Sequence, residues 1–361
     1  MAARVESQKL GLAARLPVRR ILLIVLSIAI VLGVGLGTIE TVQLNRFTGA
    51  NWRDLVINGI ARGSVYALIA MGYTLVYGVL FMINFAHGEV FMTGAFTAFF
   101  VAQALADSGF LNSNPVIAII ILFAVSMSVS TVVAILLERL AYRPLRGAPR
   151  LVPLITAIGA SLFLQYTFRG LYGAQVKGYP TIDVIARNQS WTILGVEVSR
   201  PNVVVITAAI VLVIALYFLI AKTKTGRSMR AVGEDREIAA LMGVNVDRVI
   251  VQTFAIGGAL AGAAGILYVF LFNQVAFFMG FLPGIKAFTA AVLGGIGNPV
   301  GAAIGGLILG VLEAVGPILF FAGAGVPSYN QLQPVIAFGI LVLVLIFRPG
   351  GILGSPDEEK A

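Results

Sequence analysis

Residues 58 to 96 read NGIARGSVYALIAMGYTLVYGVLFMINFAHGEVFMTGAF, and they lie inside an apolar stretch from Leu55 to Ala106. Within this stretch only Arg62, His87 and Glu89 carry a charged or imidazole side chain. A helix needs about 20 mostly apolar residues to cross the hydrocarbon layer of a bilayer. The stretch is therefore long enough for two membrane spans, which we expect to be joined near residues 82 to 89.

The whole chain has the composition of a membrane protein. Of its 361 residues, 59% are hydrophobic and 11% are charged, with a mean hydropathy of +0.97. An average soluble domain has roughly 25% charged residues. The 41 glycines are spread through the apolar runs without a strict period, as in close-packed transmembrane helices. This composition excludes an ordinary globular enzyme.

Further apolar runs predict an all-α polytopic protein with about 8 to 10 transmembrane helices. Residues 21 to 39 follow Arg15, Arg19 and Arg20 and lack a convincing A-x-A cleavage site, so we interpret them as a retained first span. The other runs cover 115–137, 151–172, 202–221, 249–272, 284–296, 300–321 and 332–347. The run at 284–296 is short enough to be a half-helix or re-entrant element. The runs lack the alternation of a β-barrel.

Charged loops predict how the spans are oriented. Arginines and lysines crowd the connections at 138–150 and 222–248, whereas 107–114 and 322–331 have none. By the positive-inside rule, the basic connections are cytoplasmic, and 107–114, 173–201 and 322–331 face outward. We expect a multi-pass protein of the cell (inner) membrane with both termini in the cytoplasm. The same rule explains the net charge of +9, because the basic residues lie in short clusters between apolar runs. We therefore expect no nucleic acid as a partner.

The chain lacks the residues that most catalytic and cofactor sites require. It has no cysteine and a single histidine, so we expect no metal site and no cofactor. It also lacks the G-x-x-x-x-G-K-[ST] phosphate loop. We therefore expect that the chain is not an enzyme.

The connection at 222–248, KTKTGRSMRAVGEDREIAALMGVNVDR, predicts a short amphipathic helix. Asp235 is suited to its N-cap, residues 236–242 to its body, and Gly243 to the left-handed position that ends it. Ile238, Leu241 and Met242 share one face by their spacing. Two interpretations follow: a solvated or interfacial loop helix, or a docking helix for a cytoplasmic partner.

Within this helix, Glu237, Ala239, Ala240 and Gly243 of EIAALMG resemble the EAA-x-x-x-G coupling motif of ABC importer permeases. The wider chain resembles the LivH-type branched-chain amino-acid permeases. The matching segments are 58–96, ERLAYRPLR (138–146), LITAIGASLFLQ (154–165), TGRSMRAVGEDREIAALMGVNVDRVI (225–250), GIKAFTAAVLGGIGNPVGAAIGGLILG (284–310) and RPGGILG (348–354). On this resemblance, residues 54–354 form the permease domain, 1–53 a basic tail, extra span and linker, and 355–361 a short cytoplasmic tail.

The resemblance also implies partners and a substrate. It implies a second, LivM-like permease, two cytoplasmic ATPase subunits, an extracytoplasmic substrate-binding protein, and import of leucine, isoleucine and valine. Asp235, Glu237, Ala239, Ala240 and Gly243 would couple this chain to the ATPases. Arg62 stands where the family more usually has a small or uncharged residue, so importers of urea, short amides or other amino acids are an alternative. A stand-alone channel or carrier is another.

The segment INFAHGE at 83–89 allows two interpretations. Asn84 and His87 could cap the ends of a surface connection, or a broken helix could line the translocation path, with Asn84 and Glu89 facing a zwitterionic substrate. Arg62 and Lys286 are isolated cations that either extend to an interface or face the same path. Glu313 could pair with either cation. The candidates for the substrate path are therefore Asn84, His87, Glu89, Arg62 and Lys286.

Glycines at four-residue spacing predict helix-packing faces in the last third of the chain. Small residues at this spacing let two helix backbones approach closely. The faces include Gly257, Gly258, Gly262, Gly265, Gly301 and Gly305.

Overall fold

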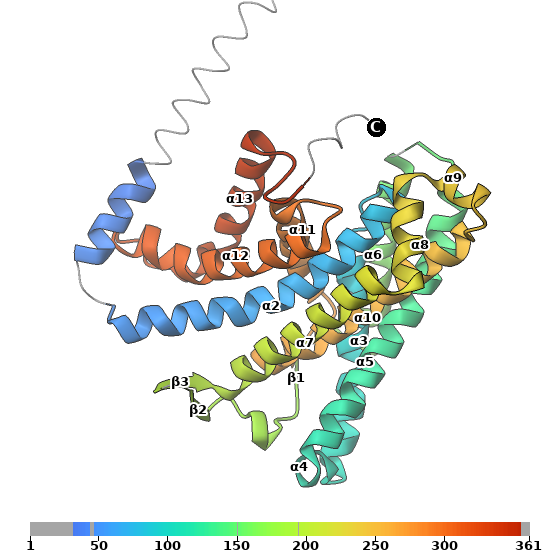
Figure 1. Cartoon of the computed structure of the whole chain (residues 1–361). Coiled ribbons are helices and arrows are strands. Elements are labelled where there is room, and N and C mark those ends of the chain that lie inside the picture. Colours follow the sequence, from blue (N-terminus) through green and yellow to red (C-terminus); the bar gives the residue numbers. More distant parts are fainter. Residues whose placement is uncertain (1–31, 44–46, 150, 194, 355–361) are drawn as a thin grey trace, which may run out of the picture.

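The computed structural model describes residues 32–43, 47–149, 151–193 and 195–354 (Figure 1). The α-helices after residues 32–43, which are also helical, are α2 (Gly49–Leu80), α3 (His87–Asp107), α4 (Phe110–Ser113), α5 (Pro115–Leu137), α6 (Leu151–Tyr172), α7 (Arg200–Lys222), α8 (Lys224–Glu234), α9 (Arg236–Leu241), α10 (Val246–Phe272), α11 (Phe281–Gly294), α12 (Pro299–Pro317) and α13 (Gln333–Phe347). Shorter π and 3-10 elements are η1 (Glu138–Tyr142), η2 (Arg143–Leu145), η3 (Asp183–Ile185), η4 (Ile318–Ala322) and η5 (Tyr329–Leu332).

Eight helical stretches in the described part of the chain are long and apolar enough to cross a membrane. They confirm the predicted fold class and include two spans within residues 49–107, one before and one after a break at 81–86. The predicted first span at 21–39 lies mostly outside the described residues, as does the predicted tail at 355–361.

Helix α11 is shorter than a membrane span, as the sequence predicts for this region. Its 14 residues rise about 21 Å, against a hydrocarbon thickness of about 30 Å. The chain between α10 and α11 is not helical, yet Val275, Ala276 and Met279 are buried there. Irregular backbone at membrane depth is tolerated where protein buries it.

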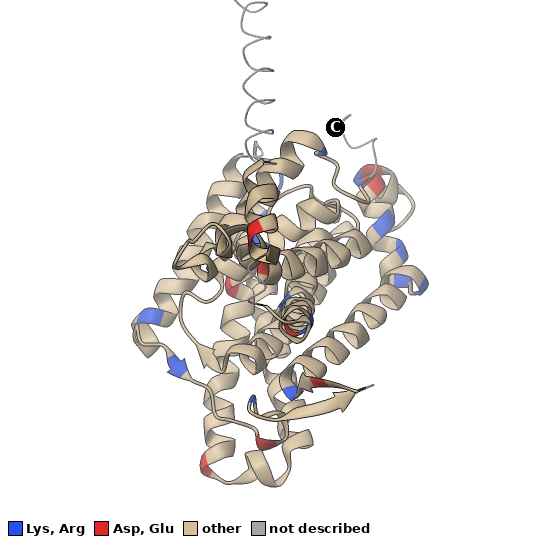
Figure 2. Cartoon of the chain, turned by 90° about the vertical axis from the view of Figure 1, so that its left-hand side faces the viewer, with Lys and Arg blue, Asp and Glu red and all other residues tan. Residues whose placement is uncertain are grey.

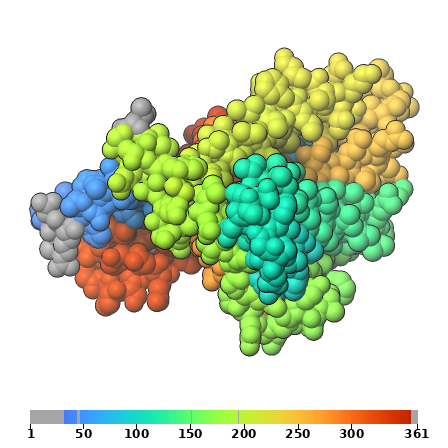
Figure 3. All heavy atoms as spheres, turned by 90° about the horizontal axis from the view of Figure 1, so that it is seen from below, coloured from blue at the N-terminus to red at the C-terminus, as the bar shows by residue number. Residues whose placement is uncertain are grey.

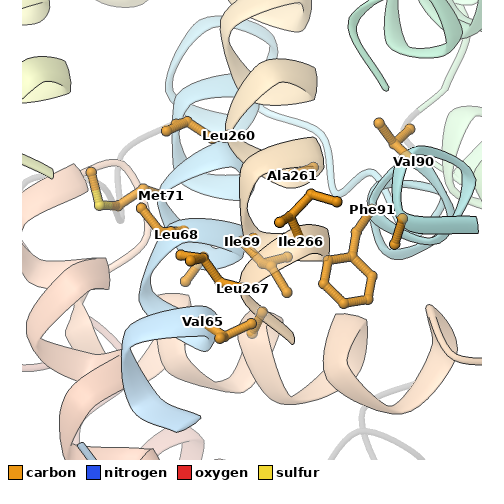
Figure 4. Packing of buried hydrophobic residues seen from close by; sticks show 14 of the residues in the cluster. Val65, Leu68, Ile69, Met71, Val90, Phe91, Leu260, Ala261, Ile266 and Leu267 are labelled. Carbon is orange, nitrogen blue, oxygen red and sulfur yellow. The ribbon is translucent and has the colours of Figure 1, made fainter. Parts of the chain in front are cut away.

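The core forms around α2, which packs on α12, α10 and α11. Figure 4 shows Leu68 and Ile69 of α2 beside Ile266 and Leu267 of α10, with Phe91 of α3 next to them. All five side chains are at most 2% exposed. By contrast α5, α6, α7 and α13 keep much of their apolar surface uncovered in this chain.

Glycines bring the central helices into close contact. A Cβ on Gly258 would lie 2.7 Å from Ala134 Cβ of α5, and one on Gly265 would lie 2.9 Å from the Phe91 carbonyl oxygen. Other glycines meet neighbouring helices in the same way: Gly257 faces Gly72, Gly262 faces Ser126, Gly301 faces Gly294, and Gly305 faces Ala290. These glycines let helix backbones approach closely.

The bundle has two distinguishable ends. The α9 end carries α8, α9, η1, the C-terminus of α2 and the start of α10. The hairpin end carries the strands β2 (Ser190–Ile193) and β3 (Val196–Ser199), paired antiparallel in register Ser190 to Ser199. Figure 2 shows that charged residues are sparse along the helices between these ends.

A second strand pair joins two distant segments. β1 (Lys177–Gly178) pairs antiparallel with β4 (Gln274–Val275), with Lys177 opposite Val275. It therefore ties the connection between α6 and α7 to the non-helical backbone before α11.

The helical residues 32–43 pack beside η4, the π-helix that follows α12. The Gly323 amide donates to Thr41 Oγ1 at 2.8 Å, and Thr41 Oγ1 donates to the Ile318 carbonyl at 3.4 Å. Figures 1 and 3 show this dark blue segment next to the orange-red C-terminal helices at one side of the molecule.

Candidate functional site

Helix α9 is capped at both ends as the sequence predicts. Asp235 Oδ1 accepts hydrogen bonds from the amides of Glu237 at 2.8 Å and Ile238 at 2.9 Å. At the other end Gly243 has φ +83°, and its amide donates to Ala240 while the Val244 amide donates to Ala239. This pair of hydrogen bonds is a Schellman motif. The motif requires a residue in the left-handed conformation, which glycine adopts at the lowest energetic cost.

The apolar face of α9 points away from the rest of the chain. Ile238, Leu241 and Met242 are 59%, 87% and 79% exposed, while Ala239 is buried against the bundle. Glu237 and Ala240 are also exposed. Ala239 therefore anchors α9 while the residues around it are presented to the surroundings.

Arg236 attaches α9 to the end of α2. Its Nη2 donates to the Val79 carbonyl at 2.8 Å, in the last turn of α2. Burial lowers the pKa of the Arg236 guanidinium, and the neighbouring Arg146 lowers it further. Beside this bond the backbones of α8 and α2 also meet, because a Cβ on Gly233 would lie 2.6 Å from the Gly78 oxygen.

The break between α2 and α3 begins two residues after Val79. α2 ends at Leu80, its C-cap Phe81 is left-handed with φ 54°, and α3 begins at His87. Asn84 is 2% exposed and its Oδ1 accepts from the Tyr142 hydroxyl at 2.6 Å. Neither Asn84 nor His87 caps a helix end by its side chain, so the capping interpretation is wrong.

His87 and Glu89 are buried in the first turn of α3. The His87 ring meets the Tyr73 ring edge-on, with centroids 4.9 Å apart. Glu89 is 1% exposed, and its Oε1 accepts from Gln165 Nε2 at 2.6 Å and Ser161 Oγ at 3.4 Å, both on α6. Among the described residues, Glu89 Oε2 has no hydrogen-bond partner. The structure thus brings Asn84, His87 and Glu89 into one buried region.

The two candidate cations lie elsewhere. Lys286 is buried and forms an ion pair with Glu313 of α12, close to the Tyr66 ring, so it does not extend to an interface. Arg62 lies toward the hairpin end, where its guanidinium stands 5.7 Å from the Phe272 ring centroid and donates to Gln333 at 3.4 Å. The pairing that the sequence left open is therefore Lys286 with Glu313.

Sequence reasoning missed the partners of this buried region. Tyr142 lies on the π-helix η1, and Ser161 and Gln165 lie one turn apart on α6. Ser161 and Gln165 could have been found as two polar residues four positions apart in an apolar run, a spacing that places them on one face of a helix. Arg146, which pairs with both Glu138 and Asp247, was visible only as part of a basic loop.

These features define a multi-pass membrane protein with an exposed, double-capped helix at one end. Residues 55–345 match the family described as "Branched-chain amino acid transport system / permease component". The chain belongs to this family, so it is a permease component and not an ATPase.

Two curated relatives are similar to this chain over most of their length, and one solved structure aligns with it. The chain is 44% identical over 308 residues to the high-affinity branched-chain amino acid transport system permease protein BraD of Pseudomonas aeruginosa, covering 84% of this chain and 96% of that one. It is 41% identical over 316 residues to the corresponding protein LivH of Escherichia coli K12, with the same coverage. PsaBC from Streptococcus pneumoniae in complex with Fab aligns with a TM-score of 0.45 and 10% identity, over 86% of this chain and 96% of that one.

Proposed function

We propose that this chain is a transmembrane subunit of an ATP-driven importer of leucine, isoleucine and valine in the cell (inner) membrane. It forms the translocation path with a second, LivM-like permease, binds two cytoplasmic ATPase subunits, and receives substrate from an extracytoplasmic binding protein. The names of the relatives at 41% and 44% identity support the substrate class. The observation that carries the proposal is the exposed apolar face of α9.

Helix α9 is the docking element for the ATPase. Ile238, Leu241 and Met242 form a contiguous apolar surface too exposed to be part of this chain's own core, and exposed apolar patches mark interaction sites. Glu237 and Ala240 stand beside it, and the Asp235 and Gly243 caps fix its two ends. The α9 end is then cytoplasmic, in agreement with its arginines, and we expect both termini on the same side of the membrane.

The connection to the path runs through α2. Arg236 holds the last turn of α2, which leads directly into the break at 81–86 and then to Asn84, His87 and Glu89. A displacement of α9 by the ATPases therefore acts on the backbone that precedes the candidate path residues. Lys286 and Arg62 remain candidates for the substrate path, but they lie apart from this break. Lys286 is already paired with the buried carboxylate of Glu313.

Replacing Gly243 with valine is expected to uncouple ATP hydrolysis from uptake without preventing membrane insertion. A β-carbon at a left-handed position costs about 1–2 kcal/mol, a factor of about 5–30 in the population of the intact cap. The measurement is leucine uptake and ATP hydrolysis by the reconstituted complex. Gly173→Val is the matched control, because Gly173 has φ +87° with open space around it and follows α6 far from α9.

Full coupled uptake by Gly243→Val would contradict the docking role of α9. Co-purification of a tagged chain from native membranes tests the assembly itself. Two ATPase chains and a second permease support the importer. A chain that purifies alone and still passes solute supports the stand-alone channel, and a binding protein that selects urea or amides supports the other substrate class.

Arg236→Gln is expected to raise the number of ATP molecules hydrolysed per amino acid imported. A hydrogen bond from a charged donor contributes about 1.5 kcal/mol or more, roughly tenfold in an equilibrium, and glutamine is too short to reach Val79. Arg236→Lys should restore part of the coupling. Arg227→Gln, an exposed charge change on α8, serves as the control; an equal effect of both substitutions would indicate a general charge effect.

A further inference from the structure

A groove of about 230 Å³ lies between α6 and α11, next to the buried region around Glu89. Its wall is apolar where Phe85, Ile158, Leu162 and Ile285 line it, and Ser161 and Tyr73 contribute hydroxyl groups. Ile158 and Leu162 are each 47% exposed, so the groove opens onto the surface of this chain. Ile158, Ser161, Leu162 and Gln165 follow helical spacing, which places them on one face of α6.

Glu89 lies behind Ser161 of this wall, and among the described residues its Oε2 accepts no hydrogen bond. Ser161 Oγ donates to Oε1, and this leaves the hydroxyl lone pairs as acceptors at the groove. Oε2 lies beside Gly280, where a Cβ would come within 2.7 Å of it, and Gly280 immediately precedes Phe281 of the opposite wall. A buried carboxyl oxygen with no donor is costly, so its partner is to be sought outside the described chain.

The opposite wall has the complementary polarity. Phe281 and Gly284 lie in the first turn of α11. Their amides are bonded to the Phe278 and Gly280 carbonyl groups, and the dipole of the helix favours a negative group at this end. The first turns of α3 and α11 meet there, because a Cβ on Gly284 would lie 3.0 Å from Gly88 Cα. The groove thus combines the hydroxyl groups of Ser161 and Tyr73, the positive end of α11 with Glu89 beside it, and an apolar surface.

We propose that this groove is a transient binding site for the transported amino acid. The ammonium group lies against Ser161 and Glu89, the carboxylate faces the first turn of α11, and the aliphatic side chain lies on Ile158, Leu162 and Ile285. This inference rests on the proposed function and adds a substrate site within the permease itself. It also predicts that α6 and α11 face the path shared with the second permease.

Photo-crosslinking in the assembled transporter tests the site directly. The complete complex in proteoliposomes, with ATP and the binding protein, is irradiated during uptake of a leucine analogue that carries a diazirine in its side chain. We expect labelled peptides at 158–162 and 281–285, and loss of the label with excess leucine. Labelling confined to other segments, or labelling that excess leucine does not reduce, would overturn the proposal.

Glu89→Gln tests the role of the carboxylate. Leucine uptake is expected to fall about tenfold or more, as for loss of a charge-assisted hydrogen bond, while ATP hydrolysis stimulated by the binding protein persists. Asp107→Asn, at the exposed end of the same helix, is the control. Unchanged uptake, or an equal fall in uptake and ATP hydrolysis, would overturn the site.

Two further results keep the outcomes separate. If Glu89→Gln does not fold, Leu162→Trp, which fills the groove from an exposed position, should block uptake, whereas Leu151→Trp at the start of α6 should not; equal uptake by both variants overturns the site. If the unmodified complex imports no leucine, the proposed function itself fails. If it imports leucine but is labelled elsewhere, only the groove fails.

Discussion

Replacement of Lys286 by methionine is expected to lower the free energy of unfolding by about 3–5 kcal/mol, because it leaves a charge buried without its partner. Lys286 pairs with Glu313, which is 1% exposed, and the second carboxyl oxygen of Glu313 has no other partner among the described residues. Among the described residues, Lys286 is the cation that forms an ion pair with Glu313. The loss is measured by denaturant titration of the purified protein in mixed micelles.

The double variant Lys286→Met, Glu313→Leu shows whether the loss of stability comes from the unpaired charge of Glu313 or from the loss of the lysine side chain itself. Replacing both members of a buried pair by apolar residues of similar size is often neutral or stabilising, so most of the lost stability should return. Arg53→Met is the surface control: Arg53 pairs with Asp54 where both side chains are at least 40% exposed, and such pairs contribute at most about 1 kcal/mol. A Lys286→Met effect no larger than that of Arg53→Met would contradict the prediction.

Gly306→Leu is expected to prevent α12 from packing on α2. A Cβ at Gly306 would lie 2.5 Å from both the amide nitrogen and Cα of Ala67, and backbone atoms cannot move aside as a flexible side chain can. Overpacking a core typically costs about 1–3 kcal/mol, and more where the neighbour is rigid. We expect little folded protein in the membrane, measured as the monodisperse fraction after detergent extraction.

Gly339→Leu is the matched control for this substitution. Gly339 is also a helical glycine in an apolar run, on α13, but nothing lies within 4 Å of an added Cβ. The two variants gain the same side chain and lose the same helix-destabilising glycine. Equal yields from both would show that the α2–α12 contact is not limiting.

The spans and the caps of α9 could be predicted because both depend on local sequence. Apolar length alone decides which runs can cross a membrane, and a cap depends on residues such as Asp235 and Gly243 that bond within one turn. The short α11 was visible for the same reason, since 284–296 is too short to span.

The contacts that build the buried region could not be predicted, because they join residues far apart in the chain. Glu89 and Gln165 are 76 positions apart, and Asn84 and Tyr142 are 58 apart. Tyr142 reaches Asn84 from a π-helix, and no sequence signal of η1 was available. The sequence offered two possible partners for Glu313, and only tertiary packing selects Lys286.

The pairing of β1 with β4 has a consequence for biosynthesis. Lys177 and Val275 lie 98 positions apart, so the ribosome must complete α7, α8, α9 and α10 before β4 exists. Until then the backbone groups of β1 have no strand to bond with, and closing so long a loop carries an entropic cost. The pairing of these two short strands therefore marks a late step, possible only after α10 has been synthesised.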